Sequence, residues 1–161
     1  MVSMLKKNIK IDRAAMELIS LFNNISGAII KDCLIFKNPE NDSEVIIFLV
    51  KEQDVGKAIG KAGEHVKDLK SKLNKKIDVI AFSESLQKFI QNILQTTKNS
   101  IIVQNIEIKE SRNFKKTVII TVRPQDRGKA IGKDGSMIRK IKVLVLRYFE
   151  VDNVIINTKN I

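Results

Sequence analysis

GKAIGKAG at residues 56–63 and GKAIGKDG at residues 128–135 are nearly the same octapeptide, written twice in a chain of 161 residues. The match extends outward, because EQDVGKAIGKAG (52–63) and PQDRGKAIGKDG (124–135) agree at nine of twelve positions. A repeat with so long a period indicates a duplicated structural unit rather than chance composition. We therefore expect two copies of one small domain.

The sequence around the first octapeptide predicts the elements of one unit. An amphipathic helix over 12–22, with Asp12 as its N-cap, precedes two β-rich runs at 27–36 and 44–50. A second amphipathic helix follows the octapeptide, and a strand at 77–82 ends the unit.

The second half repeats this order of elements. A helix over 85–94 begins behind a serine cap, and strands are predicted at 101–108 and 117–122. The octapeptide, another amphipathic helix and a strand at 154–156 complete the half. Each half thus contains helix, strand, strand, short helix, glycine turn, helix and strand.

The predicted boundary between the halves lies at the serine-containing junction 83–85. We expect residues 1–83 and 84–161 to form two α+β domains, each a three-stranded sheet covered by helices. Domains of about 80 residues are small but large enough to fold.

The charge of the chain favours an acidic partner. Lys and Arg number 29 against 18 acidic residues, a formal charge of +11 that suits nucleic acid or an anionic membrane surface. Residues 1–83 hold 14 basic against 11 acidic side chains, and residues 84–161 hold 15 against 7. We expect the second domain to contribute more to salt-sensitive binding.

Membrane segments and secretory signals are not predicted. The longest apolar run, VIIFLV at 45–50, is far shorter than the roughly 20 residues of a membrane-spanning helix and indicates a buried strand. The N-terminal segment carries charges within its apolar part and lacks a cleavage site of small residues. We expect a cytoplasmic protein that binds no membrane.

The octapeptide contains start and stop signals for a short helix. Asp54 and Asp126 stand where an N-cap is expected, and the helix should end at Gly60 or Gly132, because glycine readily adopts a positive φ. A two-residue turn then leads into the next helix.

This Gly-x-x-Gly turn suits an anionic ligand. Without bulky side chains at Gly63 or Gly135, a phosphate backbone can approach the peptide, where the free N–H groups of the following helix favour an anion. Lys61 and Lys133 add a cation inside each turn. The pattern therefore indicates phosphate recognition.

Nucleotide-binding motifs do not fit the pattern. A P-loop needs four residues between its glycines and Ser or Thr after the lysine, whereas three residues separate Gly56 from Gly60 and Ala62 follows the lysine. A dinucleotide fingerprint needs a glycine two positions before Gly60 or Gly132, and none is present.

IGKAG at 59–63 and IGKDG at 131–135 resemble the I-G-x-x-G core of the KH domain, which clamps about four nucleotides of single-stranded RNA. A helix and two strands ahead of the motif resemble the type II arrangement. The resemblance covers nearly the whole chain and implies tandem type II KH domains.

The resemblance assigns RNA-binding roles by position. The four residues of each Gly-x-x-Gly turn would clamp the RNA backbone, namely Gly60, Lys61, Ala62 and Gly63 in the first copy and Gly132, Lys133, Asp134 and Gly135 in the second. Ile59 and Ile131 would line the apolar groove beneath the bases. Further contacts are expected from the flanking residues Lys57, Lys67, Arg127, Lys129, Arg139 and Lys140, whereas His65 is expected to face solvent rather than RNA. Asp134 departs from the favourable pattern, because its carboxylate should repel phosphates.

Aromatic residues give little support for a stacking platform. No Phe or Tyr lies inside either octapeptide, so we expect an aliphatic groove to hold the bases. Phe114, in RNFKK, is either an exposed stacking residue or part of a strand edge, and we favour the strand edge.

Catalytic and metal-binding constellations are not evident. The only histidine, His65, has no cysteine or acidic pair at metal-ligand spacing, and no nucleophile motif is present. The single cysteine, Cys33, is expected in the core. We predict a non-enzymatic protein without cofactor or metal.

A close pair of type II KH domains resembles the archaeal NusA-like transcription termination factors. The resemblance implies single-stranded RNA as the partner, with a role in transcription termination or antitermination. Contact with RNA polymerase or the elongation complex stays open. The alternatives are a ribosome-associated or ribosome-assembly KH protein and a KH-derived protein-interaction scaffold. We expect a monomer.

Overall fold

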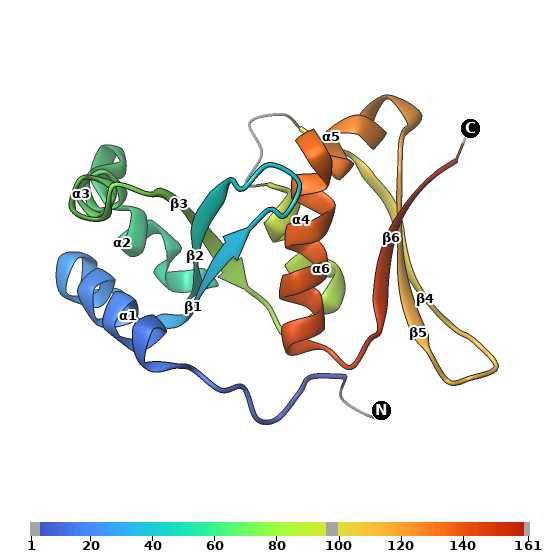
Figure 1. The fold of residues 1–161 in the computed structure, drawn as a ribbon, viewed down its shortest axis with the longest axis horizontal. Helices are drawn as coiled ribbons and strands as arrows, with labels where there is room; N and C mark the ends of the chain where they lie inside the picture. The colour runs from blue at the N-terminus through green and yellow to red at the C-terminus, as the bar shows by residue number, and fades with distance from the viewer. Residues whose placement is uncertain (1–3, 96–99, 160–161) are drawn as a thin grey trace. The chain divides into compact units, whose positions relative to one another are not determined.

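The computed structural model describes residues 4–95 and 100–159, and the chain divides into two compact units (Figure 1). One unit is Lys10–Ser83, and the other combines Glu84–Ile161 with the segment before Lys10. Both units mix helices with a three-stranded sheet, which confirms the predicted α+β class.

The first unit has the predicted order of elements. Its helices and strands are α1 (Arg13–Ser26), β1 (Ile30–Lys37), β2 (Glu44–Lys51), α2 (Val55–Ile59), α3 (Glu64–Leu73) and β3 (Lys76–Phe82). Strand β2 lies at the centre of the sheet, antiparallel to β1 and parallel to β3. Short 3-10 turns, Glu52–Asp54 and Lys61–Gly63, flank α2.

The second unit repeats the fold. Its elements are α4 (Leu86–Leu94), β4 (Val103–Glu110), β5 (Lys116–Val122), α5 (Arg127–Ile131), α6 (Ser136–Tyr148) and β6 (Asn153–Thr158). The central strand β5 is antiparallel to β4 and parallel to β6. The 3-10 turns Pro124–Asp126 and Lys133–Gly135 flank α5.

Aromatic contacts mark the two cores. In the first unit the Phe22 and Phe48 ring centroids lie 4.8 Å apart, edge to face, in a cluster that includes the buried Leu69. In the second unit Phe89 packs edge to face on Tyr148 at 5.9 Å. The apolar run at 45–50 is a fully buried stretch of β2, as predicted. Helix packing over these strands positions the glycine turns.

The caps of the first helix of each unit also match the sequence. Asp12 accepts a hydrogen bond of 2.8 Å from the amide of Ala15, and the Ser85 side chain accepts one of 3.4 Å from the amide of Lys88. Each side chain supplies a partner for one of the amides that a helix start leaves unpaired.

The segment before Lys10 departs from the expected division at 1–83, because it packs in the second unit. Leu5 forms a β-bridge with Phe149, and the amide of Lys6 donates to the carbonyl of Tyr148 at 2.8 Å. The Lys6 ammonium also donates to the Leu146 carbonyl at 2.7 Å. The last carbonyls of α6 lack partners within the helix, so a cation there is stabilising.

Candidate nucleic-acid interface

The first glycine turn has a backbone that only a few residue types adopt easily. Helix α2 ends at Gly60, with φ 80° and ψ 170°, and Ala62 and Gly63 follow with φ of 55° and 73°. The Gly63 amide donates to the Gly60 carbonyl at 3.1 Å and closes the turn. Helix α3 starts immediately afterwards.

The second turn reproduces the first closely. Gly132 has φ 79° and ψ 168°, Asp134 has φ 53°, and Gly135 has φ 73°. The Gly135 amide donates to the Gly132 carbonyl at the same 3.1 Å. Two sequences that differ at Ala62 and Asp134 therefore form one backbone shape.

Steric room explains the glycine that ends each short helix. A Cβ at Gly60 would lie 2.6 Å from Nδ1 of His65, and one at Gly132 would lie 2.7 Å from the amide nitrogen of Met137. Positive φ adds strain for any L side chain. We conclude that both positions require glycine for folding, whatever they bind.

Gly56 and Gly128, the first glycines of the two octapeptides, have no such requirement. Both are exposed and helical, and a Cβ at either position would meet nothing within 4 Å. Folding therefore does not explain them. Bare backbone at an open surface is what a phosphate chain needs for close approach.

The helices after the turns present their positive ends at this surface. Gly63 and Gly135 are the N-caps of α3 and α6, and neither helix start is capped by a side chain. Lys61 and Lys133 are exposed within the turns. An anion placed here meets helix amides, the positive end of a dipole and a cation.

Asp126 holds the chain just before the second turn through hydrogen bonds to its side chain. It does not act as the N-cap that the sequence predicts. Its Oδ2 accepts hydrogen bonds from the Arg123 Nε at 2.7 Å and from the Ile102 amide at 3.1 Å. The Arg123 hydrogen bond, with that of Ile102, lowers the pKa of this buried carboxyl below its ordinary value. Lys129 Nζ lies 3.9 Å from Oδ1, so the carboxylate holds one of the motif's cations nearby.

The first turn is held by a different contact. Asp54 makes no capping hydrogen bond either, and His65 Nδ1 lies 2.8 Å from the Lys57 carbonyl oxygen. Since a carbonyl only accepts, the imidazole Nδ1 carries the proton and donates it. The histidine therefore links α3 to α2, a role that the sequence did not reveal.

The structure places the expected contact residues in three groups. Six cations are exposed on or beside the turns, namely Lys57, Lys61, Lys67, Arg127, Lys129 and Lys133. Ile59, Ile131 and Arg139 are partly buried. Lys140 is buried, with 8% of its surface exposed, because it lies on the packed side of α6. We therefore remove Lys140 from the candidate contacts.

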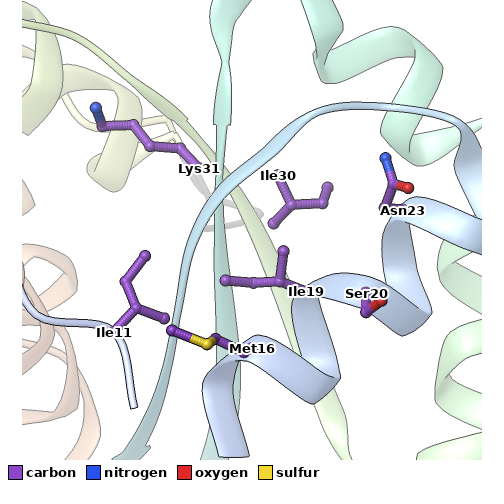
Figure 2. Close-up of a pocket in the computed structure, with 7 residues that line it drawn as sticks. All are labelled: Ile11, Met16, Ile19, Ser20, Asn23, Ile30 and Lys31. Carbon is purple, nitrogen blue, oxygen red and sulfur yellow. The ribbon is translucent and has the colours of Figure 1, made fainter. Parts of the chain in front are cut away.

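An apolar groove elsewhere in the first unit is separate from the turns. Figure 2 shows it between α1 and β1, with Ile11, Met16, Ile19 and Ile30 pointing into the space. Its lining includes no residue of either octapeptide. It therefore adds nothing to the candidate interface.

Metal-ligand clusters and membrane-spanning helices are both absent from the described ranges. Within residues 4–95 and 100–159, no three His, Cys, Asp or Glu side chains are grouped as metal ligands. No helix in these ranges has the length and apolar character to cross a bilayer.

Comparison with known proteins agrees with the fold. The KH domain family model matches residues 18–110. A probable transcription termination protein NusA of Methanococcus vannielii is 36% identical over 91% of this chain and 78% of its own length. Its counterpart in Thermoplasma acidophilum is 32% identical, over 91% of this chain and 94% of its own length.

A solved structure shares the architecture. The crystal structure of APE1850 superposes with a TM-score of 0.77 at 31% identity and covers 91% of this chain and 100% of that one. Fold and turns together define a protein with tandem KH domains. The chain belongs to the KH-domain family and, within it, to the archaeal NusA-like proteins. That family is non-enzymatic, as the sequence predicts for this chain.

Proposed function

We propose that this chain binds single-stranded RNA through both Gly-x-x-Gly turns and acts in transcription termination or antitermination. The observation that carries the proposal is the pair of turns with nearly identical dihedrals. At the third residue of the turn, ψ is 25° in Ala62 and 30° in Asp134. Turns kept this similar, with open glycines beside them, support two working clamps.

The chemistry of the turns favours RNA backbone over other anions. Each clamp would hold phosphates with helix amides and Lys61 or Lys133, while Ile59 or Ile131 contacts the bases. A KH clamp holds about four nucleotides of a single strand, whose bases are free to turn into an apolar groove. Two linked clamps would raise affinity through effective concentration.

Family membership supports the proposed transcriptional role. Several archaeal relatives carry the name probable transcription termination protein NusA. RNA emerging during transcription is single-stranded before it folds, which suits a clamp of this type. We extend the role to this chain on that basis.

The direct test is fluorescence-anisotropy titration of a labelled single-stranded RNA of about a dozen nucleotides, enough for two clamps. Binding should exceed that of duplex RNA of equal length. The salt dependence should correspond to about 0.7 per phosphate contacted, summed over several contacts. Equal binding of duplex and single strand would contradict the clamp.

The cellular role needs a separate test. A tagged chain expressed in an archaeal host should copurify with RNA polymerase in nuclease-treated extracts or with nascent transcripts after crosslinking. Recovery with ribosomal subunits alone would instead favour the ribosome-associated alternative. Gly63→Asp with Gly135→Asp is the control, because RNA-dependent recovery must disappear in that double variant.

A further inference from the structure

The β4–β5 hairpin of the second unit ends in an exposed loop at residues 111–115. The Ser111 amide donates to the Lys115 carbonyl at 2.8 Å, and the Phe114 amide donates to the Ser111 carbonyl at 3.0 Å. Phe114 is 80% exposed and lies outside β5, which begins at Lys116. The favoured interpretation of Phe114 as part of a strand edge is therefore wrong.

The backbone at Phe114 is unfavourable for phenylalanine. Its φ is 61°, in the left-handed region where Gly, Asn and Asp are the usual residues. Asp42 stands at the matching position of the first hairpin, two residues before the second strand, with φ 58°. The turn therefore needs a left-handed residue at this point but does not need an aromatic one.

Phe114 also contributes nothing to the core. All seven phenylalanines lie within the described ranges, and the other six are buried or partly buried. Burial is the usual source of stabilisation from an aromatic ring. A ring that strains its backbone and remains in solvent indicates a surface that meets a ligand.

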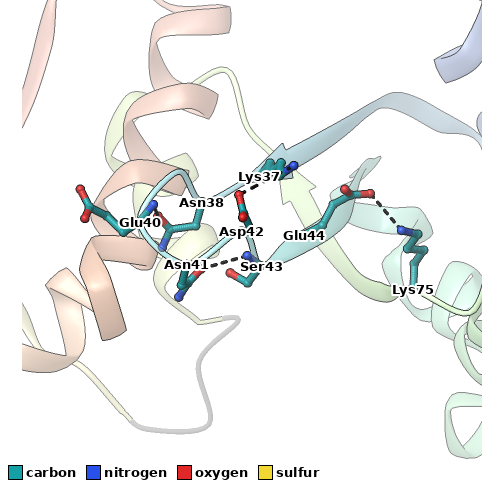
Figure 3. A network of polar contacts seen from close by, with 8 residues as sticks. All are labelled: Lys37, Asn38, Glu40, Asn41, Asp42, Ser43, Glu44 and Lys75. Atoms are coloured by element: carbon teal, nitrogen blue, oxygen red, sulfur yellow. Dashed lines mark hydrogen bonds and ion pairs between the residues drawn. The ribbon is translucent and has the colours of Figure 1, made fainter.

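The two hairpin tips differ in charge. Figure 3 shows the first tip as a polar network, in which Asp42 pairs with Lys37 at 3.8 Å and Glu44 pairs with Lys75 at 3.4 Å. Its sequence, NPENDSE, carries three acidic residues and no basic one. The first tip is therefore unsuited to a polyanion.

The second tip is basic. In its sequence, SRNFKK, Arg112 and Lys115 precede and follow Phe114, and both are exposed. Lys115 also lies 3.9 Å from Asp152, a long ion pair in which the lysine side chain stays 69% exposed. One exposed ring between cations matches the chemistry of a base and its phosphates.

We propose that Phe114, with Arg112 and Lys115, stacks on an unpaired base of single-stranded RNA that runs beyond the second glycine turn. The proposal rests on the proposed RNA-binding function and adds a contact outside both clamps. Aromatic stacking on single strands tolerates any base, because every base has a π face. The contact therefore adds affinity without strong sequence preference.

A protein or membrane partner fits the tip less well. Docking surfaces on proteins combine several apolar side chains over hundreds of Å². Within 111–116, Phe114 is the only apolar residue, and its neighbours are polar or charged. Membrane insertion likewise draws on several apolar side chains. One ring suffices for one base.

The position of the tip sets the length of RNA required. Figure 1 shows the hairpin tip and α5 at opposite ends of β5. The seven residues of β5, Lys116–Val122, span about 23 Å in an extended strand. The RNA must continue for several nucleotides past the clamp, which itself holds about four, to cover that distance. An RNA that fills only one clamp therefore does not reach Phe114.

Anisotropy titrations with a 5-nucleotide and a 20-nucleotide RNA test the contact in the full chain. Phe114→Asn suits the left-handed backbone and removes the ring. We expect it to weaken binding of the longer RNA at least about fivefold and to leave the shorter RNA unchanged. Phe114→Trp should retain binding, and Phe114→Leu should lose as much as Phe114→Asn, because stacking needs a ring.

Asp42→Asn is the matched control at the first tip and should leave the affinity for both RNAs unchanged. If Gly135→Asp weakens binding while Phe114→Asn does not, the clamp stands and the stacking contact is refuted. If the wild-type chain binds neither RNA, the proposed function itself fails. Loss of binding to phosphatidylglycerol vesicles without loss of RNA affinity in Phe114→Asn would replace the RNA contact with a membrane contact.

Discussion

Asp134 places a carboxylate inside a turn that we propose binds phosphate, and its backbone explains why it is there. Its φ of 53° lies in the left-handed region, which Asp and Asn adopt more readily than the Ala62 of the first turn. The sequence suggested only electrostatic repulsion at this position. The structure adds a conformational reason for the residue.

Asp134→Asn should therefore tighten RNA binding. Asparagine keeps the left-handed preference and removes a like charge that costs about 1 kcal/mol at 4 Å from a phosphate in water-like surroundings, about fivefold in affinity. Anisotropy titration measures the change. Glu17→Gln, which removes an exposed acid on α1, is the control for net charge. Equal tightening in both variants would contradict a local effect.

Asp126 makes a pH-dependent contribution to stability. Because its hydrogen bond from Arg123 lowers the folded-state pKa, the carboxylate stabilises the fold above the ordinary Asp pKa of about 3.9. This contribution is lost as pH falls through the lowered value. Asp126→Asn should lower the urea midpoint at pH 7, and the difference from wild type should shrink in acid.

The fluorescence of Tyr148 reports the urea unfolding of the second unit. Tyr148 is the only tyrosine in a chain without tryptophan, and it is buried against Phe89. If the difference in urea midpoint between wild type and Asp126→Asn stayed constant down to pH 2, the proposed contribution of the carboxylate would be contradicted. The sequence offered only a capping role for Asp126, because its partners, Ile102 and Arg123, are set by the tertiary fold.

At the scale of elements, the first two glycines of each octapeptide have separable roles. Gly60 and Gly132 end α2 and α5 in crowded, positive-φ positions, whereas Gly56 and Gly128 lie in open helical ones. The first pair is therefore needed for folding, whereas the second pair leaves room for a ligand to approach the backbone.

Alanine at these positions separates stability from binding. Gly60→Ala and Gly132→Ala should destabilise their units by about 1 to 2 kcal/mol or more, from strain and crowding. Gly56→Ala and Gly128→Ala should stabilise by about 0.5 to 1 kcal/mol, as for a helical glycine, yet weaken RNA binding by occupying the space of the phosphate chain. Urea unfolding and anisotropy measure the two effects. Unchanged affinity in the second pair would exclude close approach there.

The elements themselves were largely predictable from the sequence. Alternating and helical apolar patterns predicted the order of both units, and glycine marked the ends of α2 and α5. Strand starts moved by up to three residues, as in β1, which begins at Ile30 rather than at 27. Gly27 is instead the left-handed C-cap of α1, whose amide donates to the Asn23 carbonyl, so the strand cannot begin there.

At the scale of the whole molecule, the second unit is built from two separate parts of the chain. The segment before Lys10 forms a bridge from Leu5 to Phe149 and a hydrogen bond from Lys6 to the end of α6. No sequence pattern predicts this pairing, because residues 4–9 form irregular backbone that has no period to detect. Long-range pairing of this kind is decided by tertiary packing.

Removal of the segment before Lys10 should therefore destabilise the second unit and spare the first. Loss of the hydrogen bonds to α6 should lower the free energy of unfolding of the second unit by about 2 kcal/mol. Urea unfolding followed by Tyr148 fluorescence measures this change.

The first unit has its own probe in Cys33. Burial, with the nearby Asp32 and Asp12 carboxylates, raises the pKa of the Cys33 thiol to about 12, so it should resist alkylation at pH 8 until that unit opens. If the truncated chain showed faster labelling of Cys33 and an unchanged Tyr148 unfolding transition, the segment would stabilise the first unit and not the second.

The central claim is that both glycine turns bind RNA, and one set of titrations tests it most directly. Gly63→Asp, Gly135→Asp and the double variant are compared on a 5-nucleotide and a 12-nucleotide RNA. Asp tolerates the left-handed backbone of these positions and adds a negative charge at the clamp. We predict that each single variant weakens the 12-mer by about tenfold or more and that the double variant abolishes specific binding. Folded variants that bind the 12-mer as tightly as wild type would contradict the account.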